Sequence, residues 1–147
     1  MTNNNEYAAL KLDNQICFPL YACSRSIVSL YTPFLKPLGI TYTQYIVFLV
    51  LWEKDRISVG ELGKKLYLDN GTLTPLLKKM QEKGYLIRER SHEDERIVLV
   101  SLTEKGWELR EKAKSIPEVV GKCVPLSSED AMTLYTLLYK IMGTVDR

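Results

Sequence analysis

Residues 58–106 decide the fold, and their sequence is SVGELGKKLYLDNGTLTPLLKKMQEKGYLIRERSHEDERIVLVSLTEKG. Ser58 is a suitable N-cap for a short amphipathic helix, the triplet DNG breaks the chain, and a second helix ends at Gly84. Pro75 suits that second helix only in its first turn, where a missing N–H is no loss. The segments YLIRER and RIVLVSL then have the pattern of strands, with the polar turn SHEDE between them. A helix, a tight turn, a second helix and a hairpin predict a winged helix-turn-helix.

Amphipathic helices are predicted on both sides of this unit. Apolar residues recur at steps of three and four over residues 13–36, and the sequence PFLKPLG is expected to end that helix. The sequence TYTQ then has the pattern of a capping box, which begins a second helix. After the hairpin, Thr103 is expected to cap another helix, and a last helix begins at Ser127 or Ser128.

The predicted fold class is therefore mostly α with a small β-hairpin, in a single domain of residues 1–147. The winged helix-turn-helix lobe takes about residues 58–102 of it. Long helices at about residues 13–36 and 127–145 are surplus to that lobe, and their apolar stripes need a partner. A second copy related by a twofold axis is the simplest partner. We therefore expect N- and C-terminal dimerisation helices and a homodimer.

The composition argues against several other classes of protein. The chain has one histidine and three cysteines, with no CxxC pair, so neither a metal site nor a histidine-based catalytic centre is expected. The longest apolar run, IVFLVLW, is far shorter than a membrane span, and no secretory signal is visible at the N-terminus. We expect a cytoplasmic protein that is not an enzyme, has no cofactor and does not contact a membrane.

The second helix and the hairpin carry side chains that suit double-stranded DNA. Small polar residues at the start of the helix are able to reach base edges or phosphates, and lysines and arginines follow. Asp94 is placed to hold an arginine of the hairpin that enters the minor groove. The candidate residues are Asn70, Thr72, Thr74, Lys78, Lys79, Lys83, Arg88, Arg90 and Arg96. The alternative is a solvated surface, because residues 61–96 hold eight basic and seven acidic residues and are nearly neutral.

Cys17, in the sequence QICFPL, is a candidate redox sensor. The thiolate is the reactive form of cysteine, and a helix N-terminus favours that negative charge. Pro19 has no N–H to donate to the carbonyl of residue 15, which is expected to leave an acceptor beside the thiol. The apolar neighbours of Cys17 favour an organic peroxide over hydrogen peroxide. The alternative is ordinary core packing, which is the interpretation we prefer for Cys23.

The segment from LGKKLYLDNG to RIVLVSLTEKG resembles the DNA-binding lobe of the multiple-antibiotic-resistance regulator (MarR) family. The sequence DER before the last strand and the sequence LTEKG after it are the most specific features. The sequences NQICFPLYACSRS and YTPFLKPLGITYTQY narrow the resemblance to the organic-hydroperoxide-resistance regulators (OhrR). Members of that branch are dimeric repressors that release DNA when a peroxide oxidises one cysteine.

The resemblance implies a role for individual residues. The sensing cysteine of that branch and the two partner tyrosines that hydrogen-bond it match Cys17, Tyr31 and Tyr42. Cys123 stands where one subgroup has a resolving cysteine that forms an intersubunit disulfide, and a low-molecular-weight thiol is the alternative. The DNA-binding matches are Asp69, Asn70, Thr72, Thr74 and Lys78 in the recognition helix and Asp94 and Arg96 in the wing. Two positions depart from the pattern, because Asn70 stands where serine is common and Pro19 where an ordinary helix former is expected.

The leading hypothesis is thus a homodimeric repressor that binds a pseudo-palindromic operator and releases it when an organic hydroperoxide oxidises Cys17. Three alternatives remain. The first is a regulator of the same fold that senses a phenolic or drug-like ligand, with Cys17 not the sensor. The second is a thiol peroxidase, and the third is a helical interaction module that never contacts DNA.

Overall fold

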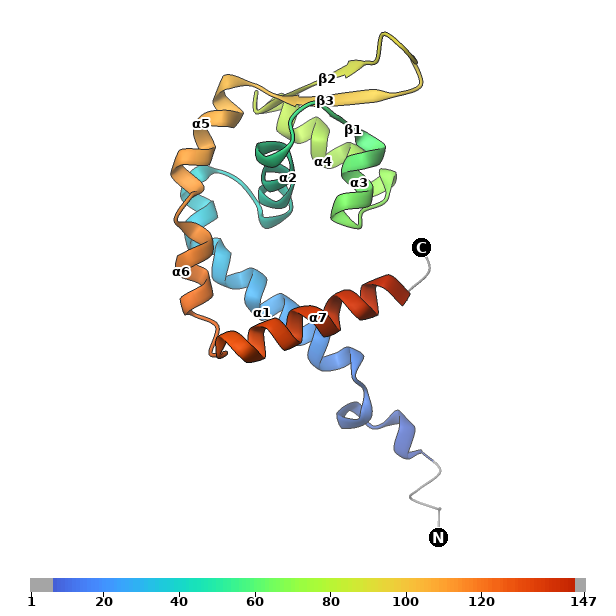
Figure 1. The fold of residues 1–147 in the computed structure, drawn as a ribbon, viewed down its shortest axis with the longest axis vertical. Coiled ribbons are helices and arrows are strands. Elements are labelled where there is room, and N and C mark those ends of the chain that lie inside the picture. The colour runs from blue at the N-terminus through green and yellow to red at the C-terminus, as the bar shows by residue number, and fades with distance from the viewer. Residues whose placement is uncertain (1–6, 145–147) are drawn as a thin grey trace.

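The protein is described by a computed structural model, which covers residues 7–144 (Figure 1). The helices are α1 (Cys17–Leu35), α2 (Tyr42–Glu53), α3 (Val59–Leu66), α4 (Asn70–Glu82), α5 (Glu104–Ala113), α6 (Ile116–Lys122) and α7 (Ser128–Thr144). Short 3-10 turns at Ala8–Leu10, Leu12–Asn14 and Lys36–Leu38 flank α1. A small sheet lies with α3 and α4 at one end of the molecule, α1 and α7 lie at the other, and α5 and α6 run between the two ends (Figure 1).

The sheet has three antiparallel strands rather than the two that the sequence predicted. Strands β2 (Leu86–Arg90) and β3 (Val98–Leu102) form the expected hairpin, and β1 (Ile57–Ser58) pairs with the other edge of β3. The strand order is therefore β1-β3-β2. The side chain of Asp55 extends this edge, because its Oδ1 atom accepts from the backbone N–H of Leu102 at 2.9 Å. A strand of two residues is too short to show a period of two in the sequence.

Three helix starts agree with the predicted caps. Thr41 and Gln44 form a complete capping box at α2, with each side chain bonded to the backbone N–H of the other residue. The Oγ atom of Ser58 accepts from the N–H of Glu61 at 3.0 Å and so caps α3. Thr103 caps α5 in the same way and also donates from its hydroxyl to the carbonyl of residue 84.

The prolines and one helix break differ from the prediction. Pro33 lies inside α1 and does not end it, and the chain turns away only at Gly39, which has a φ of 71°. Pro75 is not in the first turn of α4 but is its sixth residue, so the backbone bond to the carbonyl of residue 71 is absent there. The helix α6 was not predicted, and it follows a break after α5 where Pro117 occupies the first turn.

The hydrophobic core surrounds α2. Val47, Phe48 and Leu51 of this helix are fully buried, and core residues of α3, α4, the sheet, α5 and α6 pack around them. The indole Nε1 of Trp52 donates to the carbonyl of Gly106 at 3.1 Å and joins α2 to the start of α5. The winged helix-turn-helix lobe and the helices α5 and α6 therefore share one core with α2.

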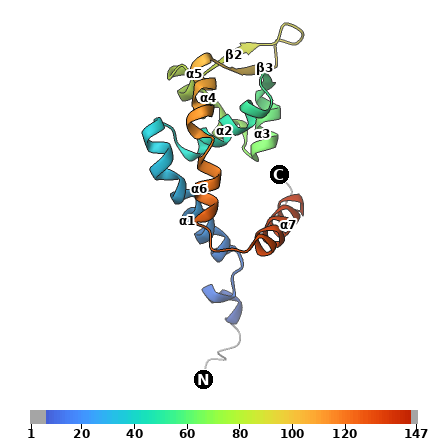
Figure 2. The ribbon, with the colours of Figure 1, turned by 60° about the vertical axis from the view of Figure 1, so that its left-hand side comes forward.

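The N-terminal half of α1 and all of α7 lie outside that core. In the view of Figure 2, α7 stands apart from the remaining helices. Its large apolar side chains are exposed, with Met132 at 66% and Tyr135 at 58% of their accessible surface, and Ile16 and Phe18 are exposed beside the start of α1. Such faces are unfavourable in water and are typical of surfaces that a partner covers.

No single helix in residues 7–144 is both long and apolar enough to cross a membrane. The helices Cys17–Leu38 and Tyr42–Glu53, which are bent at 78° to each other, pass that test only when the two are taken together, and only by length and composition.

Candidate DNA-binding surface and thiol site

The start of α4 is organised by Asp69. Its Oδ1 atom accepts from the N–H of Thr72 at 2.8 Å, and its Oδ2 atom accepts from the Thr72 hydroxyl at 3.3 Å. These bonds hold the pKa of the Asp69 carboxyl below its ordinary value, with the backbone bond to Thr72 as the largest cause. Asp69 therefore serves as the N-cap of α4, and Asn70, Thr72 and Thr74 lie exposed at that end.

The turn between α3 and α4 is tight. Tyr67 ends α3 in the left-handed conformation with a φ of 57°, and the N–H of Leu68 donates to the carbonyl of Gly63 at 3.0 Å. A Cβ atom at position 63 would lie 2.8 Å from the carbonyl oxygen of Leu68, which is closer than contact allows. Only glycine at position 63 fits this turn, which fixes the angle between α3 and α4.

The tip of the wing carries the expected arginine–aspartate pair. The guanidinium of Arg96 donates to both carboxylate oxygens of Asp94, from Nε at 3.0 Å and from Nη2 at 2.9 Å. The pair holds the pKa of Asp94 below its ordinary value and raises the pKa of Arg96. The side chain of Arg96 remains 89% exposed, so the aspartate orients this cation without covering it.

The other basic residues of the surface divide into two groups. Lys78 and Lys79 are exposed on α4, and Arg90 is exposed on β2 with its Nη1 atom bonded to the carbonyl of Glu95 at 2.7 Å. Lys83 instead turns toward the body of the molecule, because its Nζ atom donates to the carbonyl of Gly39 at 2.6 Å. Lys83 thus joins the end of α4 to the turn between α1 and α2.

Arg88 has a partner that sequence analysis missed. Its Nε atom donates to the side-chain carbonyl of Gln81, on α4, at 2.7 Å. The two residues are seven positions apart and belong to a helix and a strand, so no local pattern connects them. The contact joins the recognition helix to the wing.

The three cysteines are all exposed in the chain. Cys17 is the first residue of α1, and Cys123 is the C-cap that follows α6, where its thiol lies 3.4 Å from the carbonyl of Val119. Cys23 was expected in the core, but it projects from the half of α1 that the core does not reach.

The backbone around Cys17 differs from the expectation in one respect. The carbonyl of Gln15 was expected to remain an open acceptor, but it accepts from the N–H of Phe18 at 3.2 Å. Pro19 is the third residue of α1, and there an N–H has no intrahelical partner in any case. Pro19 therefore fits the helix start without a kink.

Tyr31 and Tyr42 form one aromatic cluster with Tyr45, which sequence analysis missed. The ring centroids of Tyr31 and Tyr42 are 5.0 Å apart, and that of Tyr45 lies 5.7 Å from Tyr31. Burial is the main cause that raises the pKa of Tyr42, and the neighbouring Tyr31 adds to it. Burial likewise raises the pKa of Tyr45 to about 12. Tyr42 and Tyr45 therefore keep their hydroxyl protons at neutral pH and remain hydrogen-bond donors.

The phenol cluster is far from Cys17 of the same chain. Cys17 and Tyr31 are the first and fifteenth residues of one helix, so about 21 Å separates them along its axis. A straight helix keeps that separation fixed. The thiol of Cys17 therefore does not reach the phenols of its own chain.

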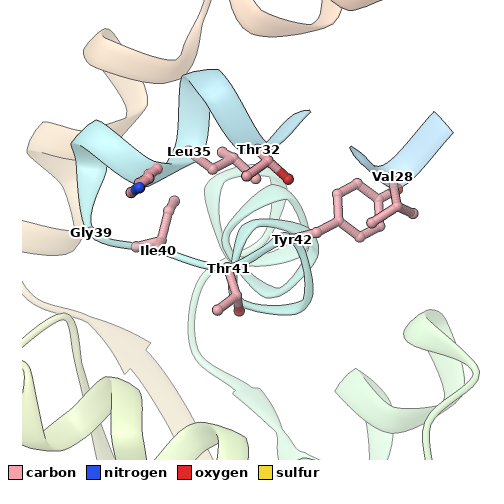
Figure 3. Close-up of a pocket in the computed structure, with 8 residues that line it drawn as sticks. Val28, Thr32, Leu35, Gly39, Ile40, Thr41 and Tyr42 are labelled. Atoms are coloured by element: carbon pink, nitrogen blue, oxygen red, sulfur yellow. The ribbon is translucent and has the colours of Figure 1, made fainter. Parts of the chain in front are cut away.

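A cavity of about 460 Å³ lies beside Tyr42, between α1 and the start of α2 (Figure 3). Figure 3 shows Val28, Thr32 and Leu35 of α1 on one side and the segment from Gly39 to Tyr42 on the other. Its lining is mostly apolar, with hydroxyl groups among it, and it has the size of a small-ligand site. No group of three or more His, Cys, Asp or Glu side chains among residues 7–144 is placed to bind a metal ion.

The chain is similar in sequence to known transcriptional regulators. The sequence pattern of the transcriptional regulator SarA/Rot family matches residues 29–113. The organic hydroperoxide resistance transcriptional regulator of Bacillus subtilis is 48% identical, over 96% of this chain and 96% of that protein. The regulator SarZ of Staphylococcus epidermidis is 39% identical, over 84% of this chain and 83% of that protein.

The fold is also that of solved regulators. Reduced AbfR bound to DNA has a TM-score of 0.77 at 33% identity, over 95% of this chain and 98% of that chain. AbfR, from Staphylococcus epidermidis, is also known in a disulfide form, which has a TM-score of 0.64 at 34% identity over 93% and 96%. A cysteine mutant of MarR from E. coli, complexed with operator DNA, has a TM-score of 0.80 at 28% identity over 89% and 98%.

These similarities confirm the predicted family and fold class: a mostly helical winged helix-turn-helix protein with a small sheet. They extend over nearly the whole chain rather than over the winged lobe alone. The chain belongs to the MarR family of winged-helix transcriptional regulators, which bind DNA and are not enzymes, and within that family to the branch of the organic hydroperoxide resistance regulators.

Proposed function

We propose that this protein is a homodimeric repressor that senses organic hydroperoxides through Cys17 and then releases its operator. The observation that carries the proposal is the separation of Cys17 from the phenol cluster of Tyr31 and Tyr42 along one helix. A twofold dimer is the simplest arrangement that brings the thiol of one chain to the phenols of the other. The exposed apolar faces of α1 and α7 support the same arrangement, because a partner would cover them.

Each subunit places α4 in the major groove and the wing in the minor groove of operator DNA. The exposed Asn70, Thr72 and Thr74 reach base edges or phosphates, and Lys78 and Lys79 contact the backbone. The wing inserts Arg96, which Asp94 holds in place. Because the dimer is twofold, the operator is a near-palindrome whose half-sites are spaced by whole helical turns. The protein acts in the cytoplasm, where that DNA lies.

The sensing step begins with the Cys17 thiolate. Its sulfur attacks one oxygen of the hydroperoxide, the O–O bond breaks, and the products are a sulfenic acid on Cys17 and the corresponding alcohol after protonation. A second thiol then attacks the sulfenic sulfur, and a disulfide forms as water leaves. Cys123 of the partner subunit or a low-molecular-weight thiol supplies that second sulfur, and the exposure of Cys123 suits this role.

Oxidation is coupled to DNA release through the tyrosines. The hydroxyl of Tyr42 donates a hydrogen bond to the thiolate, and the oxidised sulfur no longer accepts it in the same geometry. Tyr42 is the first residue of α2, the helix at the centre of the core, so its displacement moves the DNA-binding lobe. A change of about 1.4 kcal/mol in operator binding already alters the affinity tenfold.

The test is operator binding by fluorescence anisotropy, with and without an organic hydroperoxide. The matched variants are Cys17→Ser and Cys23→Ser, which remove one exposed thiol each from the same helix. We expect peroxide to release the wild type and Cys23→Ser and to leave Cys17→Ser bound. Release of Cys17→Ser by peroxide would overturn the assignment of the sensor.

The cavity beside Tyr42 supports a second candidate function, regulation by a small phenolic or drug-like ligand. Such a ligand would raise the melting temperature of the wild type and of Cys17→Ser equally, because its binding needs no thiol. Thermal melting of both proteins with a set of phenolic carboxylates distinguishes this function from peroxide sensing.

A further inference from the structure

A second cavity, of about 440 Å³, separates the recognition helix from the wing. The start of α3 forms one wall and α4 forms another, at the end of the molecule that carries the sheet (Figure 1). The hairpin forms the third wall with Arg88 of β2, Val98 of β3 and the turn residues Arg96 and Ile97. Its polar lining comes from Ser58, Asn70, Thr74, Arg88 and Arg96. Arg88 belongs to β2, and Arg96 belongs to the turn at the tip of the wing.

Both arginines of this cavity are held by a side chain beside them. Asp94 binds the Nε and Nη2 atoms of Arg96, and Gln81 binds the Nε atom of Arg88 at 2.7 Å. A guanidinium has five N–H donors, so these contacts engage one donor of Arg88 and two of Arg96. Asp94 offsets the charge of Arg96, whereas Gln81 is neutral and leaves the positive charge of Arg88 available to an anion.

The chemistry of the lining selects a phosphate. Guanidinium groups match the oxygens of a phosphate in pairs, and the Thr74 hydroxyl and Asn70 amide add neutral donors. The cavity lies between the helix assigned to the major groove and the wing assigned to the minor groove. The DNA backbone separates those two grooves, so a backbone phosphate passes this point when both elements are engaged.

We propose that this cavity holds one backbone phosphate of bound DNA, with Arg88 as its cation and Gln81 as the positioning residue of Arg88. The proposal rests on the proposed function in one respect, namely that the protein binds operator DNA. The phosphate site is a point at which the recognition helix and the wing both hold the same strand of the DNA. Gln81 lies on α4 itself, so any rotation of that helix also moves Arg88.

The first experiment measures operator affinity against salt concentration for the wild type, Arg88→Gln, Gln81→Met and the control Arg110→Gln. Arg110 lies exposed on α5 and loses the same charge in its variant. We expect Arg88→Gln to reduce the slope of log affinity against log salt by about 0.9, the value for one phosphate contact. Gln81→Met keeps every charge, and its affinity should fall about three- to tenfold through the loss of one positioning bond. Thermal melting shows that each variant is folded.

The second experiment moves a single uncharged methylphosphonate along each operator half-site. We expect one position at which the methylphosphonate lowers the affinity of the wild type but does not further lower the already reduced affinity of Arg88→Gln. At that position the methylphosphonate and the substitution remove the same contact. If the losses add at every position, the phosphate site is overturned while operator binding stands. If the wild type does not bind its operator at all, the proposed function fails and this site fails with it.

A free phosphate ion has the same chemistry, and a third measurement distinguishes it from the DNA backbone. Chloride is replaced by inorganic phosphate at constant ionic strength, without any change in the DNA. We expect equal effects on the wild type and Arg88→Gln. A larger loss of DNA affinity in the wild type would assign the cavity to free phosphate and overturn its assignment to the DNA backbone.

Discussion

Replacing Gly106 by alanine should damage the joint between the wing and α5. Gly106 is the third residue of α5, and a Cβ atom there would lie 2.2 Å from the carbonyl oxygen of Tyr85 and 3.0 Å from a methyl group of Leu102. The oxygen belongs to the backbone, so the first contact cannot be relieved by a side-chain rotation. The start of α5 must therefore move away from β2 by more than an ångström to reach an ordinary contact distance.

The size of the effect follows from what that movement breaks. Overpacking of this kind costs about 1–3 kcal/mol. The carbonyl of Gly106 accepts from Trp52, and the carbonyl of Tyr85 accepts from the N–H of Thr103, so two hydrogen bonds are strained as well. Each contributes about 1 kcal/mol. We expect Gly106→Ala to lower the free energy of unfolding by about 3–5 kcal/mol. For a chain of this size the melting temperature should fall by about 6–20 °C.

Thermal melting followed by circular dichroism measures this effect, and Gly121→Ala is the matched control. Gly121 lies in α6, and a Cβ atom there meets nothing within 4 Å, so alanine should leave stability unchanged or raise it by up to about 1 kcal/mol. A melting temperature of Gly106→Ala within about 2 °C of the wild type would refute the reasoning. It would mean that α5 adjusts its position at no cost.

Three further predictions concern sensing, pH and the contact between lobes. Tyr42→Phe should bind operator normally but react with an organic hydroperoxide about tenfold more slowly, because the thiolate loses one phenol donor. Trapping of the sulfenic acid with dimedone measures the rate of oxidation. An unchanged rate would exclude Tyr42 as a donor to the thiolate. The pKa of Asp69 is lower in the folded state than its ordinary value of 3.8, so its contribution to stability is complete above that pH and is lost as the pH falls through the lowered value. The difference in stability between the wild type and Asp69→Asn, measured in urea, should therefore shrink below about pH 4. A difference that does not depend on pH would contradict the role of Asp69 as a cap. Lys83→Met should weaken operator binding about threefold, because the end of α4 loses its contact with Gly39. Fluorescence anisotropy should show no such loss for the control Lys112→Met on α5. Equal losses in the two variants would mean that the lost charge, and not the contact with Gly39, weakens DNA binding.

Local chemistry was sufficient to predict the starts of α2, α3 and α5 and the hairpin. The capping box of Thr41 and Gln44 is a signal four residues long, and the structure contains it as predicted. The helix-turn-helix and the wing follow from similar short signals at Ser58, Gly84 and Thr103. Each of these features depends on neighbours in the sequence, which is why the sequence alone determines them.

Contacts between distant segments were beyond sequence analysis. The strand β1 exists because Ile57 pairs with Val100, 43 positions away, and nothing in its two residues signals a strand. Pro75 is tolerated in the second turn of α4 because packing of Leu73 and Leu77 holds that helix in place. The preference of proline for the first turn of a helix would alone have placed Pro75 nearer the start of α4.

In the candidate sites, too, contacts between sequence neighbours were predicted and contacts between distant segments were not. The Asp94–Arg96 pair is two residues apart and was predicted, whereas the bond from Gln81 to Arg88 crosses from a helix to a strand and was not. Tyr45 is the other example, because its membership of the phenol cluster depends on how α1 packs against α2. The resemblance to known regulators identified Cys17, Tyr31 and Tyr42 as matching positions, and their roles remain predictions.

The length of helix between Cys17 and Tyr31 has a genetic consequence. In the proposed dimer each sensor takes its thiol from one chain and its phenols from the other. Two alleles that are each unresponsive alone, one without the thiol and one without the phenols, then assemble a mixed dimer with one intact sensor and one that lacks both halves. Intragenic complementation of this kind is available only to a site that is shared between subunits. A cell carrying both defective genes would regain half of its sensors in every mixed dimer.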